Sequence, residues 1–213
     1  MRIIDLSYVI KERMPVYPGT PEVEIKQFSR VKNEGYAEKE MRLGTHTGTH
    51  MDAPAHMIEG EKTLDQFFLS KFTGRACLIP FSHDDLEGKD KVEYLSGFES
   101  VIRDSEFVIL YTGWSKRWGN DDYFANFPAL DKNSAEYLSG FHLKAIGIDA
   151  ISIDMADSEN FEAHHTLLSQ EILIIENLCH LDEIRQSSFL FSAFPLLIEG
   201  SDGSPVRAMA SYE

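Results

Sequence analysis

Four compact apolar runs in the middle of the chain constrain its fold more than any other feature. They occupy residues 75–81, 107–111, 145–148 and 172–175. Short apolar runs bounded by polar turn residues are typical of buried central strands. Further strands are predicted at 3–6, in the alternating segment 23–28, and in the tail at 189–198 and 206–212.

Helical patterns separate several of these strands. Residues 64–70 follow Thr63, a residue type that often caps a helix, and 134–141 follow two candidate caps, Asp131 and Asn133. A third short helix is predicted at 162–169, whereas the proline-rich segment 14–21 predicts a loop. Since helices and strands mix and several strands are adjacent in sequence, the pattern predicts an α/β fold with a mixed sheet. We expect one domain, 1–213.

The charge and the cysteines limit the classes of partner and of site. A net charge of −15 argues against nucleic acid and anionic membrane surfaces as partners. Two cysteines are too few for a disulfide scaffold or a site built of cysteine alone. Asp5, Lys11 and Glu12 interrupt the apolar N-terminal segment, unlike a signal peptide, and no apolar run is long enough to span a membrane. We therefore expect a cytoplasmic protein.

The segment LGTHTGTHMDAPAH, residues 43–56, concentrates the chemistry of the chain. His46, His50, Asp52 and His56 are spaced by even numbers of residues. Because side chains of an extended chain alternate between two faces, an extended segment would direct all four to one side. Imidazole with carboxylate is the ligand mixture that Zn, Mn, Fe or Co uses at open, working sites. The alternative, a polar strand face with solvated histidines, explains this density of ligands less well.

A second group of candidate residues lies in the later half of the chain. Glu176 follows the apolar run 172–175 and so stands at the carboxyl end of a strand, where binding groups gather in α/β sheets. It could instead be a surface or helix-capping carboxylate. His164 or His165, on the preceding helix, could reach the same place. Asp149 could orient a ligand histidine or accept hydrogen bonds from turn amides.

These residues together resemble a known family. HTGTHMDAPAH at 46–56 is similar to the HxGTHxDxPxH signature of the cyclase-like metal-dependent hydrolases, of which bacterial kynurenine formamidase is the best-defined member. The resemblance extends through IDLS at 4–7, PVYPG at 15–19 and GIDAISID at 147–154 to His164 and Glu176. It therefore covers most of the chain, and it implies a swivelling β/β/α fold.

The resemblance also implies a role for each candidate ligand. His46, His50 and Asp52 would bind a first divalent metal. Asp52 and Glu176 would bridge to a second, which His164 would complete, because its spacing to Glu176 is the family's. The expected cofactors are two Zn ions, with Mn as the alternative, because the same ligands serve both metals.

The remaining implied roles concern catalysis, substrate and assembly. His56 would be the general acid and base, and Tyr17 would line the substrate pocket where the formamidases usually carry Trp. The expected reaction is hydrolysis of a small amide by metal-activated water, most simply N-formylkynurenine to kynurenine and formate. The alternatives are ring opening of a cyclic amide, as in isatin hydrolases, and metal binding without catalysis. Family members are dimers or tetramers, so we expect a homo-oligomer.

Overall fold

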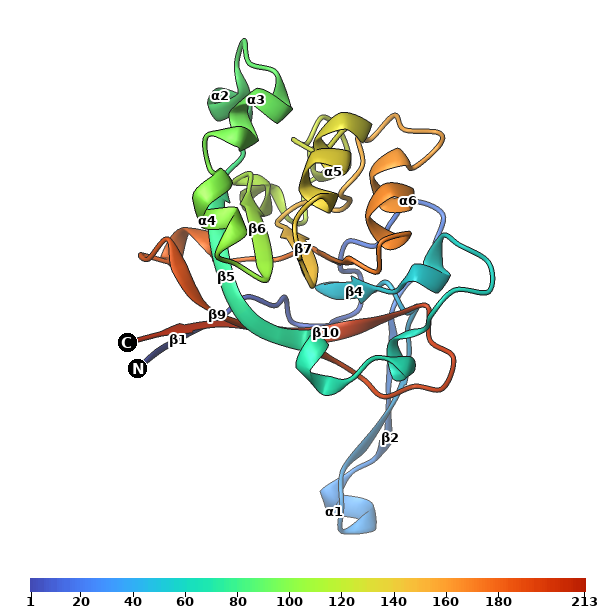
Figure 1. Cartoon of the computed structure of the whole chain (residues 1–213). Helices are drawn as coiled ribbons and strands as arrows, with labels where there is room; N and C mark the ends of the chain where they lie inside the picture. The colour runs from blue at the N-terminus through green and yellow to red at the C-terminus, as the bar shows by residue number, and fades with distance from the viewer.

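Eight strands form one mixed sheet that curls around its own core (Figure 1). The computed structural model describes all 213 residues. The strands are β1 (Arg2–Asp5), β4 (His50–Asp52), β5 (Thr73–Pro80), β6 (Phe107–Tyr111), β7 (Ala145–Ile148), β8 (Leu173–Glu176), β9 (Ser188–Pro195) and β10 (Gly203–Tyr212). Their order is β1-β10-β4-β8-β7-β6-β5-β9, and β9 also pairs with β10. This additional pairing closes seven strands into a barrel, with β1 attached to the far end of β10.

The strand directions confirm the predicted mixed α/β fold. β5, β6, β7 and β8 run parallel to one another. All the pairings of β4, β9 and β10 are antiparallel. The four apolar runs form these parallel strands. β6, β7 and β8 are buried on both faces and so are apolar at nearly every position, whereas β5 is buried mainly in its second half.

The core has two parts, one on each face of the curled sheet. In β6, Phe107 and Ile109 pack inside the barrel, while Val108 and Leu110 pack on its outer face. The inner cluster has 21 buried residues and the outer cluster 25. Since successive side chains of a strand point to opposite faces, each central strand contributes to both clusters.

The helices cover the outer face of the parallel strands (Figure 1). They are α2 (His83–Leu86), α3 (Lys91–Ser96), α4 (Glu99–Arg103), α5 (Lys132–Ser139) and α6 (Glu162–Leu168). Of the two candidate caps of α5, Asp131 is used, and its carboxylate accepts a hydrogen bond from the amide of Ser134 at 2.9 Å. The helix predicted at 162–169 is confirmed as α6. No helix has the length and apolar character that crossing a bilayer requires.

The helix predicted at 64–70 is wrong. The segment forms two separate 3₁₀ turns, η2 (Leu64–Gln66) and η3 (Leu69–Phe72). Thr63 and Gln66 cap each other across the first turn, and the backbone of Phe67 is then extended. Phe68 is 87% exposed, so no continuous apolar face is available to hold a longer helix against the core.

A two-stranded arm projects from the barrel (Figure 1). It consists of β2 (Glu24–Ser29), the short helix α1 (Val31–Glu34) and β3 (Glu38–Arg42). The strand predicted at 23–28 is confirmed as β2, in which three of the six side chains are exposed. Its partner β3 was not predicted, because all five of its side chains are exposed and four of the five are charged.

Candidate metal centre

Strand β4 directs two candidate ligands away from the barrel interior. Met51 points into the inner core, so His50 and Asp52, on either side of it, face outward. In the antiparallel register of β4 and β8, His50 lies directly opposite Glu176. Such cross-strand neighbours have Cβ atoms about 4.5–5.5 Å apart, and the Nε2 of His50 lies 3.4 Å from a carboxylate oxygen of Glu176.

Asp52 lies at the centre of the cluster. Its Oδ1 is 2.7 Å from the Nδ1 of His46 and 3.3 Å from the Nε2 of His50. Its Oδ2 is 3.7 Å from the Nε2 of His164, which also lies 3.4 Å from Glu176. The structure therefore brings together all five residues that the sequence proposed as metal ligands.

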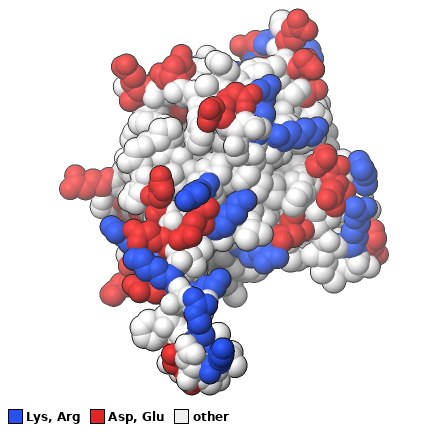
Figure 2. All heavy atoms as spheres, turned by 180° about the vertical axis from the view of Figure 1, so that it is seen from behind, with Lys and Arg blue, Asp and Glu red and all other residues white.

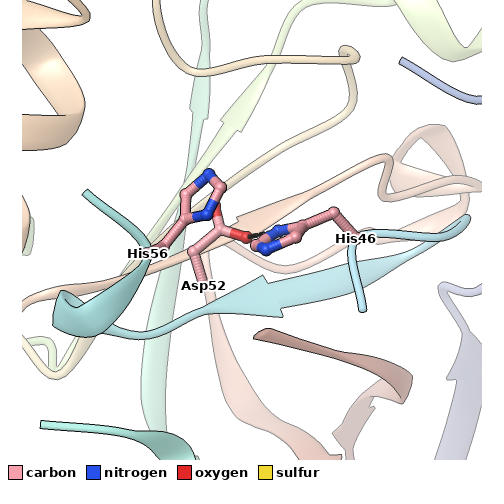
Figure 3. Close-up of side chains that lie close together, drawn as sticks. All are labelled: His46, Asp52 and His56. Atoms are coloured by element: carbon pink, nitrogen blue, oxygen red, sulfur yellow. Dashed lines mark hydrogen bonds and ion pairs between the residues drawn. The ribbon is translucent and has the colours of Figure 1, made fainter. Parts of the chain in front are cut away.

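His46 and His56 approach Asp52 from the two turns that flank β4 (Figure 3). Only residues 50–52 of the segment are strand, so His46 and His56 do not lie on the strand face that His50 and Asp52 share. His56 ends a 3₁₀ turn, Pro54–His56, which begins at the proline. This turn lets the ring of His56 pack on that of His46, with centroids 3.9 Å apart.

Helix α6 buries one of the two adjacent histidines and exposes the other. His164 lies on the buried face of the helix with Leu167 and Leu168, whereas His165 is exposed. The carboxylate of Asp154 accepts hydrogen bonds from the amides of Ala163 and His164, at 2.8 and 3.0 Å. It also lies 2.5 Å from the Nδ1 of His164. Asp154 therefore caps the helix and directs the Nε2 of His164 toward the cluster.

Asp149 accepts hydrogen bonds from a turn, which is the second of the two roles predicted for it. Its carboxylate accepts hydrogen bonds from the amide and hydroxyl of Thr112, both at 2.7 Å, and from the hydroxyl of Ser115 at 3.1 Å. It contacts no histidine, so the turn-binding alternative is the observed one. The residue that orients a histidine is Asp154.

The charges of the cluster follow from its geometry. Burial alone would raise the pKa of Asp52, but the histidines around it outweigh burial and hold the pKa well below the usual value. Burial alone would lower the pKa of His46, but Asp52 and Asp202 raise it to about 9. Burial lowers the pKa of His56, and the neighbouring His46 adds to this effect. His56 is therefore the histidine best suited to accept a proton at neutral pH.

The donor atoms fit a divalent metal. Two sets of possible ligands share Asp52, one with His46 and His56 and the other with His50 and Glu176, and within each set the donor atoms lie within 4.8 Å of one another. The Oδ2 of Asp52 is buried and has no hydrogen-bond partner. A buried carboxylate oxygen without a partner is costly, and a bound cation would satisfy it.

The cluster opens into a cavity of about 210 Å³. The ionisable part of its lining consists of His46, His50, His56, His164 and Glu176. The apolar part consists of Tyr17, Met57, Ile151 and Phe161. Tyr17 is 40% exposed and lies on the predicted loop. The structure thus places Tyr17 at the same cavity as the candidate ligands, on the apolar part of its wall.

Asp202 is a close neighbour of the cluster that no sequence pattern predicted. Its carboxylate lies 3.0 Å from the Nε2 of His46 and 3.6 Å from the Nδ1 of His56. It precedes Gly203, which pairs with Asp52 across β10 and β4. A Cβ at Gly203 would lie 2.5 Å from the ring of His46, so glycine is needed there. The segment that carries Asp202 has neither a periodic pattern nor a ligand motif. Only the pairing of β10 with β4 shows that Asp202 lies beside the cluster.

Comparisons with known proteins find relatives that match nearly the whole chain. The family model "Putative cyclase" matches residues 4–155. The chain is 34% identical to an uncharacterized protein of Methanocaldococcus jannaschii, over 99% of both chains. It is also 34% identical to the kynurenine formamidase of Geobacillus thermodenitrificans, over 96% of this chain and 95% of that one.

Solved structures of similar fold include two hydrolases. One, described as a potential metal-dependent hydrolase with cyclase activity, has a TM-score of 0.80 and 28% identity, covering 98% of this chain and 96% of its own. The other is an isatin hydrolase bound to the product analogue thioisatinate, with a TM-score of 0.85 and 26% identity, covering 98% of this chain and 91% of its own.

Proposed function

This chain belongs to the cyclase family and is a hydrolase, and from that premise we propose that it is a metal-dependent amidohydrolase acting on an aryl formamide. The observation that carries the proposal is the buried cluster around Asp52, whose Oδ2 has no hydrogen-bond partner within the protein. A cluster of three histidines and two carboxylates at the floor of a cavity is a costly arrangement unless it binds a cation.

The residues divide into ligands and a proton carrier. His46, His50 and Asp52 would hold one divalent ion, and Glu176 and His164, with Asp52 shared, would hold a second. Zn is the proposed metal, with Mn as the alternative. A divalent ion in such a site supplies acidified water and polarises a carbonyl oxygen.

His56 would move the proton during the reaction. Its Nδ1 faces the carboxylate of Asp202 at 3.6 Å, so its Nε2 is the ring nitrogen free to take a proton and return it to the departing nitrogen. Its lowered pKa keeps the imidazole neutral at pH 7, as a general base requires. Asp202, in contact with both His46 and His56, would hold the two rings in place.

The cavity wall supports an aromatic substrate. Tyr17 and Phe161 offer aromatic surface beside the ligands, and no Lys or Arg lines the cavity. An aryl group stacked on Tyr17 would place its amide over the histidines. The kynurenine formamidases among the relatives support the formyl group as the one removed.

Ring opening of a cyclic amide is the second candidate function. The absence of Lys and Arg from the cavity lining suits a neutral, flat lactam as well as a formamide. The isatin hydrolase structure has the same fold at a TM-score of 0.85.

The test is hydrolysis by the purified protein of a panel containing N-formylkynurenine, other aryl formamides and isatin. We expect the protein to hydrolyse an aryl formamide. A chelator should abolish this activity, and added Zn²⁺ or Mn²⁺ should restore it. Preferential opening of isatin would assign the second function. Stoichiometric metal with no turnover of any amide or ester would indicate a metal-binding protein without catalysis.

We also propose that the chain assembles with a second copy of itself through the arm, residues 24–42. A single hairpin projecting into water is only marginally stable, yet this one exposes Phe28, Val31, Tyr36 and Met41 by 53–68%. The arm carries five of the chain's 20 basic residues but only four of its 35 acidic residues. Figure 2 shows Lys and Arg side chains along it. Its charge therefore complements the acidic body of a second copy.

Replacing two apolar residues of the arm is expected to dissociate the oligomer. Each apolar side chain contributes about 1.5–3 kcal/mol when buried, so Phe28→Asp with Val31→Asp should raise the dissociation constant roughly 10²- to 10⁴-fold. Sedimentation equilibrium measures this constant. Phe68→Asp with Leu69→Asp is the matched control, because these residues are also exposed but lie outside the arm. A wild-type chain that is monomeric at tens of micromolar would refute the assembly.

A further inference from the structure

Asn177 follows Glu176 directly, and both its side-chain amide and its backbone are hydrogen-bonded. It is 1% exposed and adopts a left-handed conformation, with φ of 56°. Its side-chain Nδ2 donates to the carbonyl of Gly48 at 3.0 Å, and its Oδ1 accepts from the hydroxyl of Tyr123 at 2.6 Å. Its own carbonyl accepts from the hydroxyl of Thr49 at 2.6 Å. One buried residue thus connects the end of β8 to the turn between His46 and His50.

The carbonyl that Asn177 contacts also contacts a candidate ligand. The Nδ1 of His50 lies 2.9 Å from the carbonyl oxygen of Gly48. A carbonyl only accepts hydrogen bonds, so Nδ1 must carry the proton, and in the neutral ring Nε2 is left with its lone pair. That Nε2 is the atom that faces Asp52 and Glu176, at 3.3 and 3.4 Å.

The orientation of the amide is also fixed. The atom that faces the Gly48 carbonyl must be a donor, so it is Nδ2, and Oδ1 then faces the hydroxyl of Tyr123. Tyr123 is fully buried, and its ring packs edge-on against Trp118 with centroids 5.1 Å apart. The chain of hydrogen bonds from Tyr123 to His50 therefore begins at a rigid part of the core.

We infer that Asn177 is a positioning residue for the metal ligand His50. By holding the Gly48 carbonyl, it fixes the tautomer and ring orientation that present Nε2 to the metal. It also ties the turn that carries His46 and His50 to the strand that ends in Glu176. The inference rests on the proposed metal site, and it assigns to Asn177 a role in ligand orientation rather than in contact with the substrate. Groups that orient ligand histidines typically change metal affinity about 10- to 100-fold when removed.

The test compares two substitutions that suit the left-handed backbone. Asn177→Gly removes the whole side chain, whereas Asn177→Asp keeps the acceptor for Tyr123 and removes only the donor to Gly48. Asn126, an exposed asparagine with φ of 57°, gives matched controls, Asn126→Gly and Asn126→Asp. Zn²⁺ affinity is measured by competition with a chelator, and the tautomer of His50 by ¹⁵N NMR of the metal-free protein at a pH at which the ring is neutral. The melting temperature of the metal-free protein is measured in parallel.

We expect both Asn177 variants to bind Zn²⁺ on the order of 10- to 100-fold more weakly than wild type, and both Asn126 controls to bind it as wild type does. The Asn177→Asp result is decisive, because an added carboxylate by its charge alone would strengthen cation binding. We also expect the protons of His50 to redistribute between its two nitrogens in this variant.

Unchanged Zn²⁺ affinity together with an unchanged His50 tautomer would overturn the inference, even if the melting temperature falls, because Asn177 would then act only in folding. If Asn177→Gly does not fold, the Zn²⁺ affinity and the His50 tautomer of Asn177→Asp alone test the inference. If the wild-type protein binds neither Zn²⁺ nor Mn²⁺, the proposed function fails and this inference fails with it. If the wild type binds Zn²⁺ and the variants bind it equally with the same His50 tautomer, this inference is refuted while the proposed function stands.

Discussion

Asp52→Asn is expected to remove metal binding and hydrolysis together. Asp52 is 1% exposed, is shared by both candidate ligand sets and carries the only fully buried carboxylate oxygen without a hydrogen-bond partner. The amide has nearly the same shape but no charge, and its nitrogen cannot be a ligand. A metal ion contributes several kcal/mol to such a reaction, so kcat should fall by roughly 10³- to 10⁴-fold.

Elemental analysis of the purified variant, alongside kcat on the best aryl formamide, measures both effects. Asp149→Asn is the matched control, because Asp149 is an equally buried carboxylate that binds only Thr112 and Ser115. Its metal content should equal that of wild type. An Asp52→Asn protein with full metal content and near-normal turnover would refute the proposed centre.

His56→Ala is expected to lower kcat by about 10²- to 10⁴-fold, which is the usual contribution of a general acid or base, while metal content stays at the wild-type level. The ring lies beside that of His46 and at the cavity, and its lowered pKa keeps it neutral. Since the base must be unprotonated, kcat/KM of the wild type should fall as the pH drops below the pKa of this residue, and the variant should lose that limb of the profile.

His165→Ala is the control for this substitution, because His165 is an exposed histidine next to a proposed ligand. We expect it to retain wild-type metal content and turnover. If His56→Ala instead loses metal, His56 is a ligand, in keeping with its place in one of the two donor sets. If it retains both metal and turnover, another group carries the proton.

Local sequence patterns predicted the parts of the fold that depend on neighbouring residues. The apolar runs at 107–111 and 145–148 are strands with the predicted bounds, because burial on both faces leaves a continuous apolar signal. The alternation around Met51 correctly placed His50 and Asp52 on one face. The helix at 64–70 was wrong because a capping signal marks where a helix can begin, and only packing decides how far it continues.

Tertiary structure decided how the site is completed. Three residues more than 100 positions from Asp52 in the chain nevertheless contact Asp52 or the histidines beside it: His164, Glu176 and Asp202. They arrive because β4 pairs antiparallel with β8 on one side and with β10 on the other, inside a barrel closed by the β9–β10 pairing.

The sequence alone determined which residues could bind a metal, and the resemblance it carries indicated how they would be used. It could not reveal the orienting groups Asp154, Asp202 and Asn177, because none lies in a periodic pattern that reports what it contacts. Periodicity reports the few residues nearest along the chain, whereas the cluster between His46 and Glu176 is set by which strands lie side by side in the closed barrel.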